Sequence, residues 1–578
     1  MAPELVVRGG TVVDGTGAPA FTADVAVDGS GRIVEVGRVA ARGKREIDAD
    51  GLAVTPGFVD VHTHYDGQAT WDPHLTPSCW HGVTTAVLGN CGVGFAPVAP
   101  ARREWLVELM EGVEDIPGTA LSEGIRWGWE TFEQYLDALD GMPRAVDVAA
   151  QVPHAAVRAY VMGERAQDDA TADDLVAMRR IVTAALRAGA VGFSTGRTAG
   201  HRSATGEPVP GTFAPDTEIS ALLSAMESAG RGVLQVVPAG ISGEMAGDAP
   251  GAMEAELAWL TRLGRQTDRP ITFLVMQRSD APDLWRSWFD AVRVANAAGA
   301  QLRPQVGSRC FGMLFGLQSS MNPLRWRPTY QALASLPLAQ RVRSLKRPEV
   351  KAAILADAPR PSGPVMADQF ADHLMGRLYP LGPDLDYEPT RDRSVQAIAT
   401  AAGREPWDVL YDALVADGGR GFLLHPLLNY GRGSYDGLHE MMSDPLTVQG
   451  LGDGGAHCGL VCDASMTTYL LSHWVRDRTR GARLPLEVAV RRLTGDAAAL
   501  YGFADRGVVA PGRRADLNLI DLDAVGLLAP ERVDDLPAGA GRLVQRSTGY
   551  VATLVRGEVV VDGGELTDAR PGRLLRSA

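Results

Sequence analysis

The middle of the chain alternates helical and strand-like hydrophobic patterns. The clearest unit is residues 171–195, where apolar residues recur at helical spacing from Leu175 to Leu186 and precede a short apolar run at 191–194. Thr171 and Asp174 form a capping-box pair before this helix, and Gly189 ends it. Helices predicted at 217–227, 252–265 and 283–297 precede further apolar runs in the same way. Repeated helix and strand at this length predicts a parallel sheet in an α/β fold.

Nine short apolar runs are candidate strands of that sheet. They cover residues 58–61, 84–88, 146–151, 191–194, 233–237, 271–276, 301–306, 421–424 and 447–452. A TIM-type (β/α)8 barrel needs eight strands, and we expect the run at 421–424 to lie outside it. The stretch at about 317–387 breaks the rhythm with repeated prolines. We interpret it as a subdomain inserted over the barrel mouth, the alternative being a long surface excursion with no catalytic part.

The two ends of the chain have short β segments separated by turns. These segments are expected at residues 5–8, 11–13, 24–27 and 33–36, and again at 516–520, 550–555 and 559–561. Neither end has enough strands to bury a face alone, so we expect both to pair into one small β domain. The predicted division is residues 1–56 and 501–578 for that domain and 57–500 for the barrel.

Composition narrows the classes of function. The 578 residues carry a formal net charge of −14, and no Lys/Arg-rich run occurs, which argues against nucleic acid as a partner. No segment offers about 20 consecutive apolar residues, so we expect a soluble, cytoplasmic protein without a membrane partner. The five cysteines are scattered and odd in number, which favours reduced thiols over a disulfide framework.

His62 and His64 are the most informative pair in the chain. They stand two residues apart at the end of the first predicted barrel strand, so their imidazoles point the same way and can converge on one ion. Imidazole is a common ligand of zinc, and the C-terminal end of a barrel strand is where such enzymes hold their chemistry. A lone His-x-His is weak evidence, and two polar residues at a strand end are the plain alternative.

Two further positions extend this hypothesis. Cys91, after the second predicted strand, can act as a thiolate ligand, although a small buried hydrophobe is the common state of a free cysteine. Asp453 follows the last strand, which barrel closure places beside the first, so its carboxylate can approach the two histidines. There it can bind the metal and take a proton from water, the alternative being a simple Gly-Asp-Gly turn.

Several motifs occur in an order that resembles the amidohydrolase superfamily. They are TPGFVDVHTH at 55–64, GVTT at 82–85, GNCG at 89–92, GFST at 192–195, GDG at 452–454 and the segment 508–515. Within the superfamily the chain is most similar to the N-acyl-D-amino-acid deacylase (D-aminoacylase) group, nearly end to end. The resemblance implies a metal-bearing barrel, a small β-sandwich built from both termini, and amide hydrolysis. It also implies metal-site roles for His62, His64, Cys91 and Asp453, with Asp453 as the catalytic acid/base.

The chain departs from that group at the fifth and sixth strands. The group carries metal-binding histidines there, whereas this chain has VLQVVP at 233–238 and FLVMQ at 273–277. Valine and methionine do not replace imidazole on zinc, so we expect one ion, Zn²⁺ or another divalent metal. Strand-end positions supply seven candidate substrate contacts, for each of which a structural role is the alternative: Arg197, His201, Arg202, Gln235, Gln277, Arg309 and His457.

The leading hypothesis is a metal-dependent hydrolase of a C–N bond in a small N-acylated amino acid or related cyclic amide. Arg202 and its neighbours at 200–203 would suit an anionic group of that substrate. Two alternatives stay open: a one-metal lyase or decarboxylase of the same superfamily, and a non-catalytic scaffold that has lost the tight metal site. A homo-oligomer is compatible with the sequence.

Overall fold

The barrel is an eight-stranded parallel sheet. The computed structural model describes residues 2–243, 247–360 and 374–577. The strands follow the order β16-β12-β11-β10-β9-β8-β7-β6. Their bounds are β6 (Phe58–Asp60), β7 (Val83–Leu88), β8 (Asp147–Pro153), β9 (Gly192–Gly196), β10 (Val233–Val237), β11 (Ile271–Leu274), β12 (Leu302–Val306) and β16 (Val448–Gln449). The sheet closes just beyond β6 and β16, where the amide of His64 donates to the carbonyl of Gly454 over 2.8 Å. The predicted TIM-type barrel is therefore confirmed.

The predicted helices lie between the barrel strands and cover the sheet. They are α5 (Ala172–Ala188), α6 (Asp216–Ala229), α7 (Ala252–Gly264) and α8 (Leu284–Ala297), preceded by α4 (His154–Met162) and followed late in the chain by α15 (Asp436–Ser443), α17 (Leu486–Leu493) and α18 (Gly495–Leu500). The capping box of α5 forms as predicted, with the Thr171 side chain accepting from the amide of Asp174. The long connection from β7 to β8 holds α1 (Arg103–Glu114), α2 (Gly118–Gly124) and α3 (Phe132–Asp140). No helix in the described part of the chain is both long and apolar enough to cross a bilayer.

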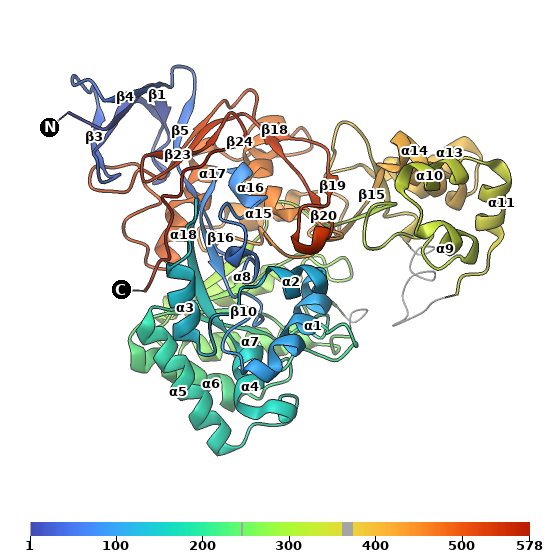
Figure 1. The fold of residues 1–578 in the computed structure, drawn as a ribbon, viewed down its shortest axis with the longest axis horizontal. Coiled ribbons are helices and arrows are strands. Elements are labelled where there is room, and N and C mark those ends of the chain that lie inside the picture. Colours follow the sequence, from blue (N-terminus) through green and yellow to red (C-terminus); the bar gives the residue numbers. More distant parts are fainter. Residues whose placement is uncertain (1, 244–246, 361–373, 578) are drawn as a thin grey trace.

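The surplus predicted strand lies outside the barrel, as expected. It is β15 (Phe422–Leu428), which pairs antiparallel with β13 (Phe311–Gly316) and β14 (Tyr379–Leu381). The sequence patterns did not indicate β13 or β14. These strands carry a helical lobe that extends away from the barrel (Figure 1). Its helices are α9 (Pro328–Ala334), α10 (Leu338–Leu345), α11 (Pro348–Ala356), α13 (Val395–Ala402) and α14 (Pro406–Gly419).

This lobe has a hydrophobic core of its own, formed by residues from Phe315 to Leu423. Pro328, Pro348 and Pro406 each stand at the start of a helix, where the missing amide is tolerated. Two of the prolines that interrupt the barrel rhythm, Pro328 and Pro348, therefore begin helices rather than break them. The residues 361–373 of the predicted insertion are outside the described residues, and its boundaries stay a prediction.

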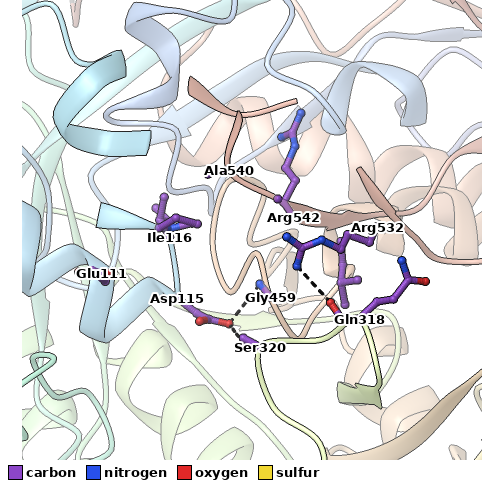
Figure 2. Close-up of a pocket in the computed structure, with 12 residues that line it drawn as sticks. Glu111, Asp115, Ile116, Gln318, Ser320, Gly459, Arg532, Ala540 and Arg542 are labelled. Atoms are coloured by element: carbon purple, nitrogen blue, oxygen red, sulfur yellow. Dashed lines mark hydrogen bonds between the residues drawn. The ribbon is translucent and has the colours of Figure 1, made fainter. Parts of the chain in front are cut away.

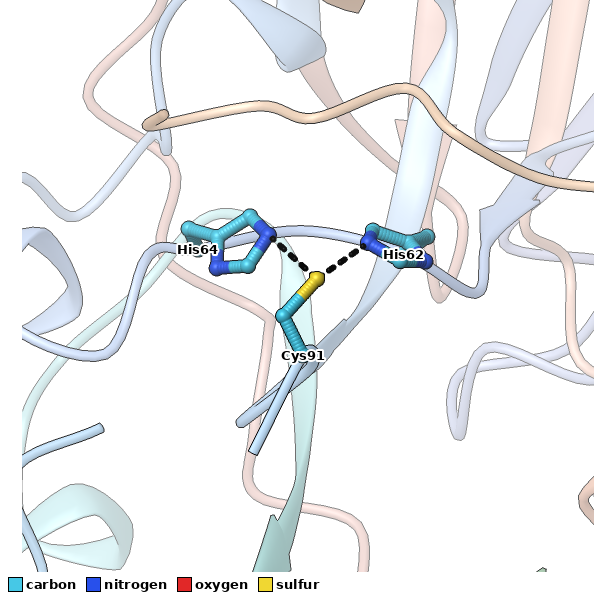
Figure 3. A group of neighbouring side chains, drawn as sticks. All are labelled: His62, His64 and Cys91. Atoms are coloured by element: carbon cyan, nitrogen blue, oxygen red, sulfur yellow. Dashed lines mark hydrogen bonds between the residues drawn. The ribbon is translucent and has the colours of Figure 1, made fainter. Parts of the chain in front are cut away.

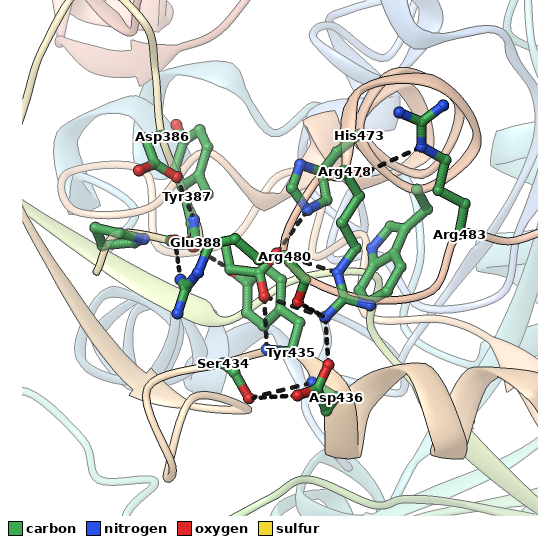
Figure 4. Close-up of polar contacts among 12 residues, drawn as sticks. Asp386, Tyr387, Glu388, Ser434, Tyr435, Asp436, His473, Arg478, Arg480 and Arg483 are labelled. Carbon is green, nitrogen blue, oxygen red and sulfur yellow. Dashed lines mark hydrogen bonds and ion pairs between the residues drawn. The ribbon is translucent and has the colours of Figure 1, made fainter. Parts of the chain in front are cut away.

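A buried ionic network joins the base of the lobe to the barrel loops (Figure 4). Glu388 is 2% exposed and accepts from the guanidinium of Arg478 and from the backbone amide of Tyr435. The His473 ring lies 3.0 Å from the same carboxylate. These partners hold the pKa of Glu388 to about 2 against the effect of burial, which acts to raise it.

Both ends of the chain contribute to one sheet, as expected. Its order is β24-β23-β22-β17-β5-β1-β2-β3, with β4 paired to β1. From the N-terminal end come β1 (Leu5–Val12), β2 (Phe21–Val27), β3 (Ile33–Gly37), β4 (Arg45–Asp48) and β5 (Ala53–Pro56); from the C-terminal end come β17 (Leu517–Ile520), β22 (Tyr550–Val555), β23 (Glu558–Asp562) and β24 (Glu565–Leu566). In Figure 1 the blue strands of the N-terminal segment lie beside the red strands of the C-terminal segment. The prediction of two separate strands at 5–8 and 11–13 was wrong in one respect. Residues 5–12 form the single strand β1, which has a bulge between Val7 and Gly10, where Gly9 has φ of 68°.

Candidate metal centre

Three side chains from the first two barrel strands meet at the C-terminal end of the barrel. His62 and His64 follow β6, and Cys91 lies in the turn after β7. The Cys91 Sγ is 3.2 Å from Nε2 of His62 and 3.6 Å from Nε2 of His64. Figure 3 shows the sulfur between the two rings. The three ligand atoms lie within 4.8 Å of one another, and all three residues are buried.

The backbone after β7 explains how the thiol reaches the histidines. Cys91 has a left-handed conformation with φ of 58°, and Gly92 follows with φ of 76°. A β-carbon at Gly92 would stand 2.8 Å from the amide nitrogen of Gly196, so only glycine fits at this close approach. The amide of Cys91 donates to Oε1 of Gln235 on β10 over 2.9 Å. The turn is thereby fixed against the neighbouring strands.

Asp453 approaches the same point from the closing strand. Its amide donates to the carbonyl of His62 over 3.0 Å, and its φ is 42°. Its Oδ1 lies 3.4 Å from Nε2 of His62 and 3.9 Å from Nε2 of His64. Burial, with repulsion from Asp463 and Asp60, raises the pKa of Asp453 well above its ordinary value.

The outer nitrogens of both imidazoles face oxygen acceptors. Nδ1 of His62 is 3.0 Å from Oε1 of Gln305 on β12, and Nδ1 of His64 is 3.2 Å from Oε1 of Glu114 at the end of α1. Burial lowers the pKa of His62 to about 4 and that of His64 well below its ordinary value, so both rings are neutral at pH 7. An acceptor at Nδ1 favours the tautomer with hydrogen there, which leaves the Nε2 lone pairs toward Cys91.

Sequence reasoning missed Glu114 and Gln305. Gln305 had a visible signal, since it is a polar residue near the C-terminal end of a predicted barrel strand. Glu114 also had one: Leu106, Met110 and Glu114 repeat at four-residue spacing on the buried face of α1. A carboxylate in an apolar helical stripe indicates a partner inside the fold.

Three of the seven predicted substrate contacts lie at the centre. Gln235 contacts Cys91 as described, and its Nε2 is buried without a hydrogen-bond partner among the described residues. His457 donates its amide to the carbonyl of Glu114, and its Nε2 is 3.8 Å from Glu114 Oε2. The ring of His201 is close enough to those of His62, His64 and His457 for its charged form to lower their pKa values, and its buried Nδ1 also lacks a hydrogen-bond partner within the described ranges.

The other four predicted contacts are engaged elsewhere. The Arg197 guanidinium pairs with Glu256 and stacks on Trp259, and the exposed Arg202 donates to the carbonyl of Gly206. The Gln277 amide bonds to the backbone of Gly431 and Pro282. Arg309 is 1% exposed, pairs with Asp463 and stacks on Tyr387. Their substrate roles stay predictions, without a contact to the centre among the described residues.

A cavity of about 400 Å³ lies beside the end of α1 and the loop that follows Asp453. It is lined by residues that neighbour Glu114 and His457 in the chain, among them Asp115 and Gly459 (Figure 2). Asp115 Oδ2 accepts from the Gly459 amide over 3.1 Å and from Ser320 over 2.7 Å. These hydrogen bonds tie the end of α1 to the loop after Asp453 and to Ser320 at the edge of the cavity. No candidate site residue predicted from the sequence lines the cavity.

Comparisons with known proteins agree with this architecture. A model of the amidohydrolase family matches residues 45–561. N-acyl-D-aspartate deacylase of Alcaligenes xylosoxydans xylosoxydans is 30% identical over 577 residues, which covers 99% of this chain and 95% of that protein.

Solved structures give the same picture. D-aminoacylase, described as defining a novel subset of amidohydrolases, superimposes with a TM-score of 0.65 at 25% identity, over 99% of this chain and 100% of that one. The metal centre of D-aminoacylase is described as binuclear, with activation by one metal and attenuation by the second. N-acyl-D-glutamate deacylase from Bordetella bronchiseptica shares the fold, with a TM-score of 0.64 at 24% identity, covering all of both chains. The chain therefore belongs to the amidohydrolase family, in its D-aminoacylase-like group.

Proposed function

We propose that this protein is a metal-dependent hydrolase that cleaves a C–N bond, an amide in a small N-acylated amino acid or a related cyclic amide. The observation that carries the proposal is the convergence of two neutral imidazoles and a thiol on one point, with the Asp453 carboxylate 3.4 Å from the nearer ring. The deacylases to which the chain is similar act on N-acyl-D-amino acids, which supports the substrate class.

The donor set fits a divalent cation. Neutral imidazole nitrogens and a cysteine sulfur are characteristic zinc ligands, and Asp453 or water can complete the coordination. The charges agree: Asp60, Asp66, Cys91, Glu114 and Asp453 are buried together, and no Lys or Arg pairs with any of them in the described residues. Burial raises the pKa of each of these groups, because their ionised forms are costly without counter-charge, and a bound Zn²⁺ would supply that charge.

We propose a single ion. The fifth and sixth strands, β10 and β11, carry no histidine, and Gln235 stands where a second set of ligands would come from. The amide of Gln235 is held by the turn of Cys91 and offers a far weaker ligand than imidazole. Activation of D-aminoacylase by one metal supports the view that one ion suffices for hydrolysis.

Asp453 is proposed as the general acid/base. An ion held by His62, His64 and Cys91 would make water more acidic and polarise the substrate carbonyl. The Asp453 carboxylate, held beside the histidine Nε2 atoms by its backbone bond to His62, takes the proton from the attacking water. It then returns the proton to the leaving nitrogen. His201 and His457 are proposed to flank the bound substrate, and Arg202, which is exposed, is proposed to receive its carboxylate.

The test combines metal analysis with the variant Asp453→Asn. We expect the wild-type protein to hold about one equivalent of Zn²⁺ and to hydrolyse some members of a panel of N-acyl amino acids of both hands. Asp453→Asn should retain most of the metal while turnover falls by about 10³-fold or more, because the proton acceptor is lost. Unchanged turnover in this variant would refute the role of Asp453.

Two further measurements separate the alternatives. Turnover in ¹⁸O-labelled water should place label in the released carboxylate, and a product without label would point to a lyase. Folded protein that binds no metal would point to a non-catalytic scaffold.

A further inference from the structure

Glu114 is a buried carboxylate that the proposed reaction does not use. It is 1% exposed and ends α1, in the connection between β7 and β8. Its Oε1 faces Nδ1 of His64 at 3.2 Å and its Oε2 faces Nε2 of His457 at 3.8 Å. The carboxylate therefore stands between one inner imidazole and a histidine at the outer edge of the centre.

The geometry excludes Glu114 from the inner ligand set. It contacts His64 on Nδ1, whereas the Nε2 atom of the same ring faces Cys91 and Asp453. The 3.2 Å contact at Nδ1 is close enough for an ion pair but does not have hydrogen-bond geometry, and neither atom has a hydrogen-bond partner among the described residues. Glu114 therefore lies behind the ring, on the side away from the meeting point of the ligands.

The backbone around Glu114 holds it against the closing strand. The Glu114 carbonyl accepts from the amide of His457, and the next residue, Asp115, accepts from the amide of Gly459 over 3.1 Å. Asp115 is left-handed, with φ of 51°, which turns the chain sharply after the helix. The end of α1 is thus fixed to the loop that follows Asp453.

We propose that Glu114 is a positioning residue that holds His64 as the tautomer with hydrogen on Nδ1 and fixes His457 beside it. The inference rests on the proposed metal centre. A carboxylate behind a ligating imidazole orients the ring and raises its basicity, and loss of such a partner weakens metal binding by about 10–100-fold. Gln305 gives His62 a neutral acceptor in the equivalent place, so the two rings are supported by acceptors of different charge.

The experiment measures the dissociation constant of Zn²⁺ by chelator competition for wild type, Glu114→Ala, Glu114→Gln and the control Glu111→Gln. Glu111 lies one turn earlier on α1 and is exposed. We expect Glu114→Ala to raise the dissociation constant by about 10–100-fold and Glu114→Gln by less, because glutamine keeps an acceptor without its charge. Glu111→Gln should match wild type.

A second readout separates positioning from a structural role. In the metal-free protein, Glu114→Gln removes a buried carboxylate without changing its shape, so the thermal midpoint should stay equal or rise. Co²⁺-loaded Glu114→Gln should also show a shifted absorption spectrum, since the His64 ring changes orientation. If Glu114→Ala fails to fold, the zinc affinity, thermal midpoint and Co²⁺ spectrum of Glu114→Gln test the proposal.

Three results would overturn the inference in distinguishable ways. Zinc affinity within twofold of wild type in the foldable variants would refute the positioning role while the metal centre stands. A fall in the metal-free thermal midpoint that parallels the loss of affinity would assign Glu114 a structural role. Absence of zinc binding in the wild-type protein would refute the proposed function itself, and the inference with it.

Discussion

At the scale of single residues, the centre depends on which atom of each side chain faces inward. The His-x-His spacing predicts two rings on one side, and the structure adds that their Nε2 atoms are the inner ones. Cys91 is the residue for which the two interpretations, metal ligand and packing residue, differ most. As a ligand it binds the ion as a thiolate, and as a small hydrophobe it only fills space.

Replacement of Cys91 with alanine distinguishes these readings. If the thiol is a ligand, Cys91→Ala should lower zinc affinity by at least about tenfold and remove the thiolate-to-metal absorption band of the Co²⁺ protein. The stability of the metal-free protein should fall by only about 1 kcal/mol, for one buried sulfur atom. Cys310→Ala, a buried cysteine elsewhere in the barrel, is the matched control. Wild-type zinc affinity in Cys91→Ala would leave Cys91 as a packing residue.

At the scale of elements, local signals predicted the helices well because their ends are set by neighbouring residues. Thr171 and Asp174 cap α5 reciprocally, and Gly189 ends it with φ of 115°. The same locality misled the interpretation of residues 5–13, where a bulge at Gly9 joins two apparent segments into one strand. Nothing local shows whether a glycine bends a strand or ends it.

The capping box of α5 gives a prediction on local stability. Thr171→Ala should destabilise the first turn by about 1 kcal/mol, because the helix loses an acceptor for an unpaired amide. Hydrogen exchange of the peptide that spans the start of α5 measures this at neutral pH. Thr183→Ala, a half-buried position inside the same helix, should leave that peptide unchanged. Equal hydrogen exchange in Thr171→Ala and wild type would contradict the capping role of Thr171.

The same turn should also respond to pH. Arg165, with the amide and hydroxyl of Thr171, lowers the pKa of Asp174 from 3.8 to about 2. Because the folded pKa is the lower one, the stabilisation by Asp174 is complete above about pH 4 and is lost as pH falls toward 2. The difference in exchange between wild type and Asp174→Asn should therefore be larger at pH 6 than near pH 3. A difference that grows on acidification would reverse the expected sign.

At the scale of the whole molecule, buried ion pairs connect the barrel to the sheet formed by the two ends. Asp147, at the start of β8, accepts from Arg506 over 2.5 Å and from Arg514 over 2.7 Å. Arg514 also pairs with Asp516, just before β17. All four side chains are buried, so each charge relies on the others.

Replacement of Asp147 with asparagine tests this connection. The change leaves two buried guanidinium groups short of a counter-charge and should lower unfolding stability by about 3–5 kcal/mol, measured by urea or thermal denaturation. Asp505→Asn is the matched control, since Asp505 pairs with the same Arg506 but is 40% exposed; it should cost at most about 1 kcal/mol. Equal effects of the two substitutions would mean that burial does not decide the strength of these pairs.

The sequence by itself determined the features that depend on local patterns or on strand ends. It gave the alternating α/β barrel, the strand that does not belong to it, the cap of α5, and His62, His64, Cys91 and Asp453 as one candidate centre. In a closed barrel the last strand lies beside the first. For this reason residues 62 and 453 could be placed together although they are far apart in the sequence.

Only the tertiary structure decided which polar side chains support that centre. Gln305 and Glu114 reach the histidines because β12 closes on β16 and α1 ends against the loop after Asp453. Arg197 and Arg309 stand at equally suitable strand ends, yet Glu256 and Asp463 bind their guanidinium groups. The physical reason is that a buried charge takes the nearest partner in space, and that partner comes from a segment far away in the chain.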